Sequence, residues 1–163
     1  MRVVVADTGP LHYLVWIGHI DLVPELFEKV FLPPEVRDEL SRAEAPSVVR
    51  AWIANPPEWL TVLTAPSAPP PDPALLKLDS GERAAIALTR SVKADGIHMD
   101  DRAGVVAARA LGFAVVGTLG VLDAAARRGL VDLEEALERL RKTTFRRTEE
   151  LFDAMLKRHK SRA

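Results

Sequence analysis

Short apolar runs along the chain alternate with longer stretches in which apolar residues recur every three or four positions. The runs predict short strands at residues 2–6, 30–32, 59–63, 96–99 and 113–116. The other stretches predict helices at about residues 10–17, 21–28, 35–43, 47–54, 80–93, 102–111, 118–128, 133–140 and 148–157. Strands that alternate with helices call for a parallel sheet with right-handed crossovers, so the pattern predicts an α/β fold.

Glycine and proline mark where the predicted elements end. Gly18, Gly112 and Gly129 each follow a helical stretch, which is a frequent position for glycine. A proline-rich stretch at residues 65–73 predicts a stiff, extended connection that is too short to separate two domains. With 163 residues, the chain suits one domain, in which residues 3–129 form the core and about 132–160 a C-terminal helical extension.

Composition narrows the class of protein. Hydrophobic residues make up 48% and charged residues 28% of the chain, which is typical of a soluble globular protein. The chain has no cysteine, which excludes disulfides and thiolate zinc sites. No apolar run reaches the length of a transmembrane helix, and the run before Asp7 is too short for a signal peptide. We therefore expect a cytoplasmic protein with no membrane partner.

Charge is balanced over the whole chain but uneven within it. A formal net charge of -1 argues against a nucleic-acid-binding protein that is basic throughout. From residue 139 onward basic residues outnumber acidic ones, among them Arg139, Arg141, Lys142, Arg146, Arg147, Lys157, Arg158, Lys160 and Arg162. Either this segment meets phosphates or an acidic partner, or it is an ordinary solvated helix face.

Acidic residues stand directly after two predicted strands. Asp7 ends the first strand in the string Asp7-Thr8-Gly9-Pro10, and Asp100 and Asp101 follow the strand at 96–99. The carboxyl ends of parallel strands meet at one edge of a sheet, where ligands bind in open α/β folds. Capping of the next helix is the alternative role for Asp7 and for one member of the aspartate pair. A second acid at one place adds repulsion, which a cation, a proton or solvent must relieve.

Two glutamates on predicted helices can reach the same edge. Glu39 borders the apolar stripe formed by Val36 and Leu40, so we expect it to point inward. The alternative is a surface carboxylate near Arg42 or Arg37. Glu82 lies on a small apolar helix face, where a charged side chain needs a partner. The alternative is a capping box in which Glu82 bonds to the amide of Asp79. Helix position leaves both interpretations of Glu82 open.

Two threonines beside glycine also follow strand ends. Thr8 and Thr118 suit turn and cap roles as well as a site, and we assign them, with Asp100, to its support. The string Gly117-Thr118-Leu119-Gly120 offers backbone amides at a helix start, a weak indication of a phosphate site. The histidines lack a metal-binding spacing, and His98 is interpreted as a core residue whose hydrogen bonds are satisfied. The chain contains no nucleophile elbow, Walker loop or dinucleotide fingerprint.

Convergence of the acids at the sheet edge would create a site made only of oxygen ligands, namely Asp7, Glu39, Glu82 and Asp101. Oxygen ligands favour magnesium or manganese over zinc. Such an ion lowers the pKa of a bound water and offsets charge on a phosphate. The chemistry that the acids predict is therefore phosphodiester hydrolysis.

Four strings occur in the order that is typical of a PIN domain. They are Asp7-Thr8-Gly9-Pro10-Leu11, LPPEVRDEL at residues 32–40, GERAAIAL at residues 81–88 and Met99-Asp100-Asp101-Arg102. Over about residues 3–129 the chain resembles VapC-like toxin ribonucleases of the PIN family. It is particularly similar to a PIN-like branch that carries GTLGVL, found here at residues 117–122.

The resemblance implies a three-layer α/β/α fold with a central parallel sheet, and a metal-dependent endoribonuclease. The catalytic acids of the family correspond to Asp7, Glu39, Glu82 and Asp101, with Thr8 as the hydroxyl beside the first acid. The implied ligands of Mg²⁺ or Mn²⁺ are Asp7, Glu82 and Asp101. The implied partners are an RNA substrate such as transfer or ribosomal RNA, a small antitoxin protein, and a second copy in a homodimer.

The chain departs from the family pattern at two positions. Glu82 stands where many toxins carry aspartate, and its longer side chain alters the spacing of the acids. Met99 replaces the threonine of the family's Thr-x-Asp register, which favours Asp101 over Asp100 as the fourth acid. The lost hydroxyl motivates an alternative function, a PIN-like module that binds protein or RNA with little or no catalysis. A receiver-like phosphoacceptor has less support, because no lysine follows the last predicted strand.

Overall fold

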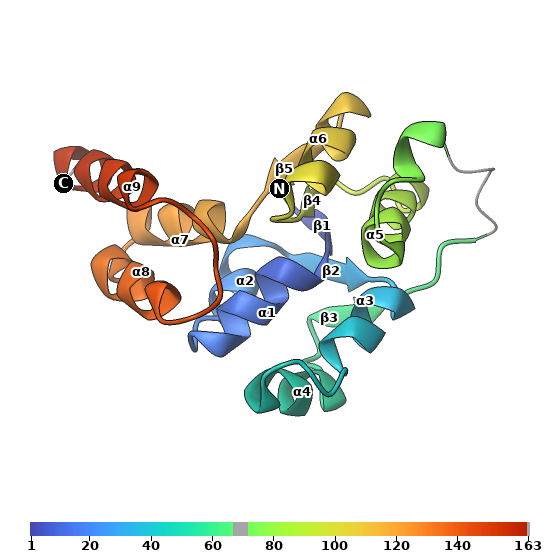
Figure 1. Cartoon of the computed structure of the whole chain (residues 1–163), viewed down its shortest axis with the longest axis horizontal. Helices are drawn as coiled ribbons and strands as arrows, with labels where there is room; N and C mark the ends of the chain where they lie inside the picture. The colour runs from blue at the N-terminus through green and yellow to red at the C-terminus, as the bar shows by residue number, and fades with distance from the viewer. Residues whose placement is uncertain (67–71, 163) are drawn as a thin grey trace.

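Five parallel strands form the centre of the computed structural model, which describes residues 1–66 and 72–162 (Figure 1). Their order in the sheet is β3-β2-β1-β4-β5, and each pair is parallel. The strands are β1 (Val3–Ala6), β2 (Lys29–Leu32), β3 (Leu60–Val62), β4 (Gly96–His98) and β5 (Ala114–Val116). The predicted strands and their parallel arrangement are confirmed.

Helices cover both faces of the sheet. They are α1 (Thr8–Trp16), α2 (Leu22–Leu26), α3 (Pro34–Leu40), α4 (Ser47–Ala54), α5 (Ser80–Ser91), α6 (Arg102–Ala110), α7 (Thr118–Arg127), α8 (Leu133–Arg141) and α9 (Glu149–Arg162). Successive side chains of a strand point to opposite faces, and Val4 and Val5 accordingly belong to two separate buried clusters. The three-layer α/β/α fold is thus confirmed. Of the helices that the structure describes, none is long and apolar enough to cross a membrane.

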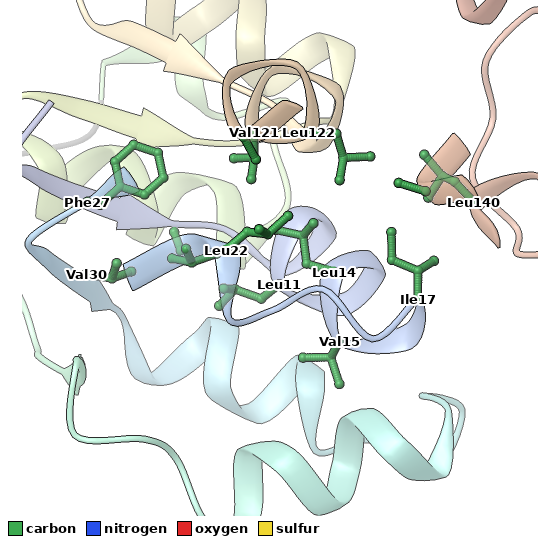
Figure 2. Close-up of a cluster of buried hydrophobic side chains, with 14 of the residues drawn as sticks. Leu11, Leu14, Val15, Ile17, Leu22, Phe27, Val30, Val121, Leu122 and Leu140 are labelled. Carbon is green, nitrogen blue, oxygen red and sulfur yellow. The ribbon is translucent and has the colours of Figure 1, made fainter. Parts of the chain in front are cut away.

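The larger buried cluster joins the sheet to α1, α2 and α7, and the smaller one joins it to α5 and α6. In Figure 2, Val121 and Leu122 of α7 lie across from α1, whose Leu14 points toward them, and Leu11 belongs to the same buried cluster. Burial of each such leucine contributes about 1.5–3 kcal/mol. The predicted C-terminal extension also reaches this cluster, because Leu140 of α8 and side chains of α9 are buried within it.

Three predicted helix ends fall at glycines whose backbone is left-handed, with φ of 79° at Gly18, 86° at Gly112 and 70° at Gly129. One short element is absent from the prediction, a 3-10 helix at Pro73–Leu75. It forms because the side chain of Asp72 accepts a hydrogen bond of 2.9 Å from the amide of Ala74. The extended connection predicted for residues 65–73 is therefore wrong at its last residue, and its residues 67–71 lie outside the described part of the chain.

Candidate active site

The order of the strands creates a switch point beside β1. The chain places β2 on one side of β1 and β4 on the other, so the connections that leave these strands diverge. Asp7 follows β1 and Asp100 follows β4 at this point, and the amide of Asp7 donates to the carbonyl of His98 at 2.8 Å. Open α/β sheets bind their ligands in the crevice at such a point.

The carboxylate of Asp7 is buried at this edge, with 6% of the residue exposed. Asp7 holds the N-cap position of α1, yet its side chain makes no capping hydrogen bond to that helix. Burial raises the pKa of Asp7 to about 7, the Thr8 amide opposes this rise, and the charges of Asp79, Glu39 and Asp100 add to it. Helix capping therefore does not account for this carboxylate, which needs a proton or a cation.

Glu39 lies between the end of β1 and the start of α5. Its Oε2 accepts a hydrogen bond of 2.6 Å from the hydroxyl of Thr8. A Cβ at Gly81 would lie 2.6 Å from Glu39 Oε1, so the glycine leaves room for the carboxylate. The alternative of a surface ion pair does not describe Glu39, since Arg37 pairs with Asp38 instead, at 3.1 Å.

Glu82 combines the two roles that the sequence left open. Its Oε2 accepts from the amide of Asp79 at 3.2 Å, and its own amide donates to Asp79 Oδ1 at 2.8 Å, which completes a capping box. Only 6% of Glu82 is nevertheless exposed. Burial raises the pKa of Glu82 to about 8, the charges of Asp79, Asp101 and Asp7 add to the rise, and the Asp79 amide opposes it. Glu82 is thus a cap residue and a member of the acidic group.

The aspartate pair after β4 divides into two different environments. Asp100 turns toward Thr118, whose amide donates to Oδ1 at 2.7 Å and whose hydroxyl donates to Oδ2 at 2.5 Å. Burial raises the pKa of Asp100, while the two bonds from Thr118 and the charge of Arg147 lower it. Asp101 is exposed and caps α6, since its Oδ1 accepts from the amides of Ala103 and Gly104 at 3.0 and 3.4 Å.

Two glycines make room for the carboxylate of Asp100. A Cβ at Gly117 would lie 2.7 Å from Asp100 Oδ1, and a Cβ at Gly9 would lie 3.4 Å from Oδ2. The strings Asp7-Thr8-Gly9 and Gly117-Thr118 therefore meet around one side chain. The two aspartates thus affect different acids. The charge of Asp100 raises the pKa of Asp7, whereas the charge of Asp101 raises the pKa of Glu82.

The predicted acids share an electrostatic environment without forming a closed ligand cage. Among the described residues, no three acidic or histidine side chains are positioned to hold one metal ion together. Several oxygens are instead engaged by protein donors, such as Thr8 for Glu39 and Thr118 for Asp100. The donor chemistry still fits a hard divalent cation, because every candidate ligand is a carboxylate and Asp7 and Glu82 carry raised pKa values.

Three further residues, Asp79, Arg147 and Met99, surround the acids. The sequence predicts Asp79 only as a cap, although its position three residues before Glu82 places both charges on one helical turn. Arg147 donates to the carbonyl of Asp100 at 3.4 Å, a long-range contact that no local pattern signals. Met99 is fully buried, and a Cβ at Gly104 would lie 2.6 Å from its sulfur, so it fills space behind the acids without offering a hydroxyl.

Comparison with known proteins identifies one similarity. A family model described as PIN domain matches residues 3–161 of this chain, nearly its whole length. No curated protein and no solved structure matches the chain significantly. The match includes α8 and most of α9, so the similarity extends past the core that the sequence strings delimit.

Proposed function

The chain belongs to the PIN domain family, which generally comprises metal-dependent nucleases, and on this premise we propose that it is a divalent-metal-dependent endoribonuclease. The observation that carries the proposal is Asp7, a carboxylate that is buried at the switch point of the sheet, makes no cap and has a pKa of about 7. A buried carboxylate without a partner destabilises the fold when it is charged. A bound metal ion would stabilise the charged form in the same surroundings.

Each acid has a proposed role in hydrolysis. Asp7, Glu82 and Asp101 would hold Mg²⁺ or Mn²⁺, which supplies a water of lowered pKa and offsets charge on the scissile phosphate. Glu39, which Thr8 holds in place, orients the attacking water and accepts its proton. Asp100 and Thr118 keep the loop after β4 in position, because two hydrogen bonds join them across the switch point.

RNA cleavage in the presence of Mn²⁺ or Mg²⁺ tests this proposal directly. We expect the purified protein to cut structured RNAs, and Asp7→Asn to lower the rate about 100-fold or more while the protein stays folded. Asp38→Asn is the matched control, because Asp38 is exposed beside Glu39 and, among the described residues, forms an ion pair with Arg37 alone. Equal cleavage by wild type and Asp7→Asn would identify a contaminating nuclease and refute the proposal.

The finer identity proposed is a VapC-like toxin that forms a homodimer and is inhibited by a small antitoxin. The order of the four sequence strings supports it. Induced expression should arrest bacterial growth, Asp7→Asn should not, and a small protein encoded beside the gene should restore growth. Growth arrest by wild type and Asp7→Asn alike would contradict a toxin that acts through cleavage, and sedimentation of a monomer would contradict the dimer.

The second candidate function is a PIN-like module that binds RNA or protein without turnover. Met99 favours it, because this fully buried methionine offers no hydroxyl at the position where the family pattern has threonine. Titration with Mn²⁺ separates the two functions. No thermal stabilisation by Mn²⁺, together with RNA binding that Glu82→Gln leaves unchanged, would favour the binding module.

A further inference from the structure

A cleft of about 870 Å³ opens next to the acidic residues, along the outer edge of the sheet. It lies between α6 and α7 beside the edge strand β5, and Figure 1 shows these three elements together. Asp100 and Gly117 line one end of it, so the cleft is continuous with the switch point. The proposed hydrolysis uses none of the rest of this cleft.

Three arginines surround the cleft, namely Arg102 and Arg109 of α6 and Arg147 of the loop between α8 and α9. All three are exposed, and in the described part of the chain none of them lies within ion-pair distance of a carboxylate. Asp100 is the one acidic residue among the described residues that line the cleft. This cleft is therefore positively charged in a protein whose net charge is -1.

The position of Arg147 is fixed by the loop that carries it. Its guanidinium lies 4.9 Å from the ring of Phe145 and donates to the carbonyl of Asp100 at 3.4 Å. Phe145 packs edge-on against Tyr13 of α1, with 5.0 Å between ring centroids, and the Tyr13 hydroxyl is hydrogen-bonded to Thr144 at 3.0 Å. The loop thus presents a cation at the end of β4, beside the acids.

Arg102 and Arg109 continue the positive charge away from the acids. They are seven residues apart on α6, which places them on one helix face about 10 Å apart along the axis. Phe27, Val115 and Leu119 are among the apolar residues that line the same cleft. A groove that combines basic and apolar side chains is typical of surfaces that follow a single strand of nucleic acid.

The edge strand itself argues against a protein strand as the occupant. The amide of Met99 donates to the carbonyl of Val116 at 3.0 Å, so Val116 faces β4 and, by the alternation of a parallel ladder, Val115 faces outward. β5 has three residues, and this alternation leaves Val115 alone to pair with an added strand. Such a short edge offers too few hydrogen bonds for strand addition.

We propose that this cleft holds the RNA strand that adjoins the scissile phosphate, with Arg147, Arg102 and Arg109 contacting successive parts of its phosphate backbone. This inference rests on the proposed endoribonuclease function. Guanidinium groups suit phosphate oxygens because they donate two parallel hydrogen bonds. The arginines act on substrate binding, so their loss raises KM and leaves kcat nearly unchanged.

Equilibrium binding of a fluorescein-labelled single-stranded RNA by full-length Asp7→Asn protein in EDTA tests the proposal. Arg109→Gln and Arg147→Gln, each added to Asp7→Asn, should weaken binding about 5-fold at low salt. Each should also reduce the slope of log Kd against log salt by about 0.7. Arg90→Gln is the matched control, because Arg90 is an exposed arginine on α5 with no ion pair among the described residues and no place in the cleft.

The outcomes distinguish this inference from the proposed function. Unchanged RNA affinity in both cleft variants, or an equal loss in Arg90→Gln, overturns the inference and leaves a protein partner as the occupant of the cleft. Cleavage of the same RNA by wild-type protein with Mn²⁺ is measured in parallel. Binding that depends on the arginines, without any cleavage, overturns the proposed endoribonuclease function and retains the cleft as an RNA site. Cleavage with an unchanged KM in the cleft variants overturns only the proposed role of the cleft.

Discussion

Thr8 Oγ1 donates a hydrogen bond of 2.6 Å to Glu39 Oε2 and so joins the end of β1 to α3. The bond turns the Glu39 carboxylate toward the switch point, where its charge helps to raise the pKa of Asp7. Thr8 is therefore a positioning residue, since it acts on the site through Glu39. Four predictions concern this acidic group, and one concerns the core beneath it.

Removal of the Thr8 hydroxyl tests whether the orientation of Glu39 matters. Thr8→Val keeps the shape of the side chain, and we expect kcat for RNA cleavage to fall about 10-fold with a loss of stability of about 1 kcal/mol or less. Thr8→Ser restores the hydroxyl and should restore most of the rate. A serine variant as slow as the valine variant would show that the hydrogen bond is not the cause.

Asp7→Asn should stabilise the metal-free protein at pH 8 although it is expected to remove most of the activity. The wild-type carboxylate is charged at that pH although burial disfavours its charge, and each unit of pKa shift corresponds to about 1.4 kcal/mol. We expect a gain of about 1–3 kcal/mol in the free energy of unfolding, measured with urea in EDTA. Asp38→Asn should change it by less than about 0.5 kcal/mol. A destabilised Asp7→Asn protein would mean that the carboxylate serves the fold.

Stability of the metal-free protein should fall as the pH rises from 6.5 to 8.5. The folded-state pKa values of about 7 for Asp7 and about 8 for Glu82 lie above their ordinary values of 3.8 and 4.5. Between the ordinary and the raised pKa values the folded state therefore binds more protons than the unfolded state. The stability that this protonation contributes is lost as the pH rises through the raised pKa values. Thermal unfolding in EDTA measures the effect.

Mn²⁺ should restore the stability that the metal-free protein loses when its buried carboxylates release their protons. We expect a larger rise of the melting temperature on addition of Mn²⁺ at pH 8.5 than at pH 6, because a metal competes with protons for carboxylates. Asp7→Asn should reduce this rise. An equal rise at both pH values, or an undiminished one in the variant, would argue against metal binding at these acids.

His98 should have the opposite effect on stability at lower pH, where the free energy of unfolding should increase as the pH rises. It is fully buried in β4, and burial lowers its pKa to about 3. The prediction that its hydrogen bonds are satisfied is wrong, because neither ring nitrogen has a partner among the described residues. Between pH 3 and its ordinary pKa of 6.5 the unfolded state binds the additional proton, so His98 costs stability that returns as the pH rises.

Replacement of His98 by leucine tests this cost. His98→Leu should raise the free energy of unfolding by about 1–3 kcal/mol at pH 5, measured by urea denaturation. The same variant at pH 8 is the control, because histidine is neutral there in both states and the gain should be smaller. A gain independent of pH would assign the effect to packing alone.

Prediction from the sequence succeeded where the signal was local. The period of apolar positions located the strands and helices, and glycines such as Gly112 marked the helix ends, because both effects act within a few residues. Local patterns also placed Asp7 and Asp100 at strand ends. The match of residues 3–161 to the PIN domain family confirms the family, while the VapC-like branch stays a prediction.

The surroundings of each acid depended on contacts between distant elements. Asp7 and Asp101 both stand at helix starts, yet Asp101 caps α6 through two amides while Asp7 makes no side-chain cap. The spacing around Glu82 is compatible with a capping role and with a place in the site. The packed structure shows that Glu82 completes the capping box and is also buried among the acids. Arg147 reaches Asp100 only through the fold of the C-terminal helices.

The sequence by itself thus determined the kind and order of the elements and the residues that end each strand. Tertiary structure alone decided that Thr8 holds Glu39, that Asp100 faces Thr118, and that a basic cleft adjoins the acids. The physical reason is that hydrophobic periodicity and backbone conformation are local, whereas the direction of a side chain across a crevice depends on strand order and on the rotation of each helix against the sheet.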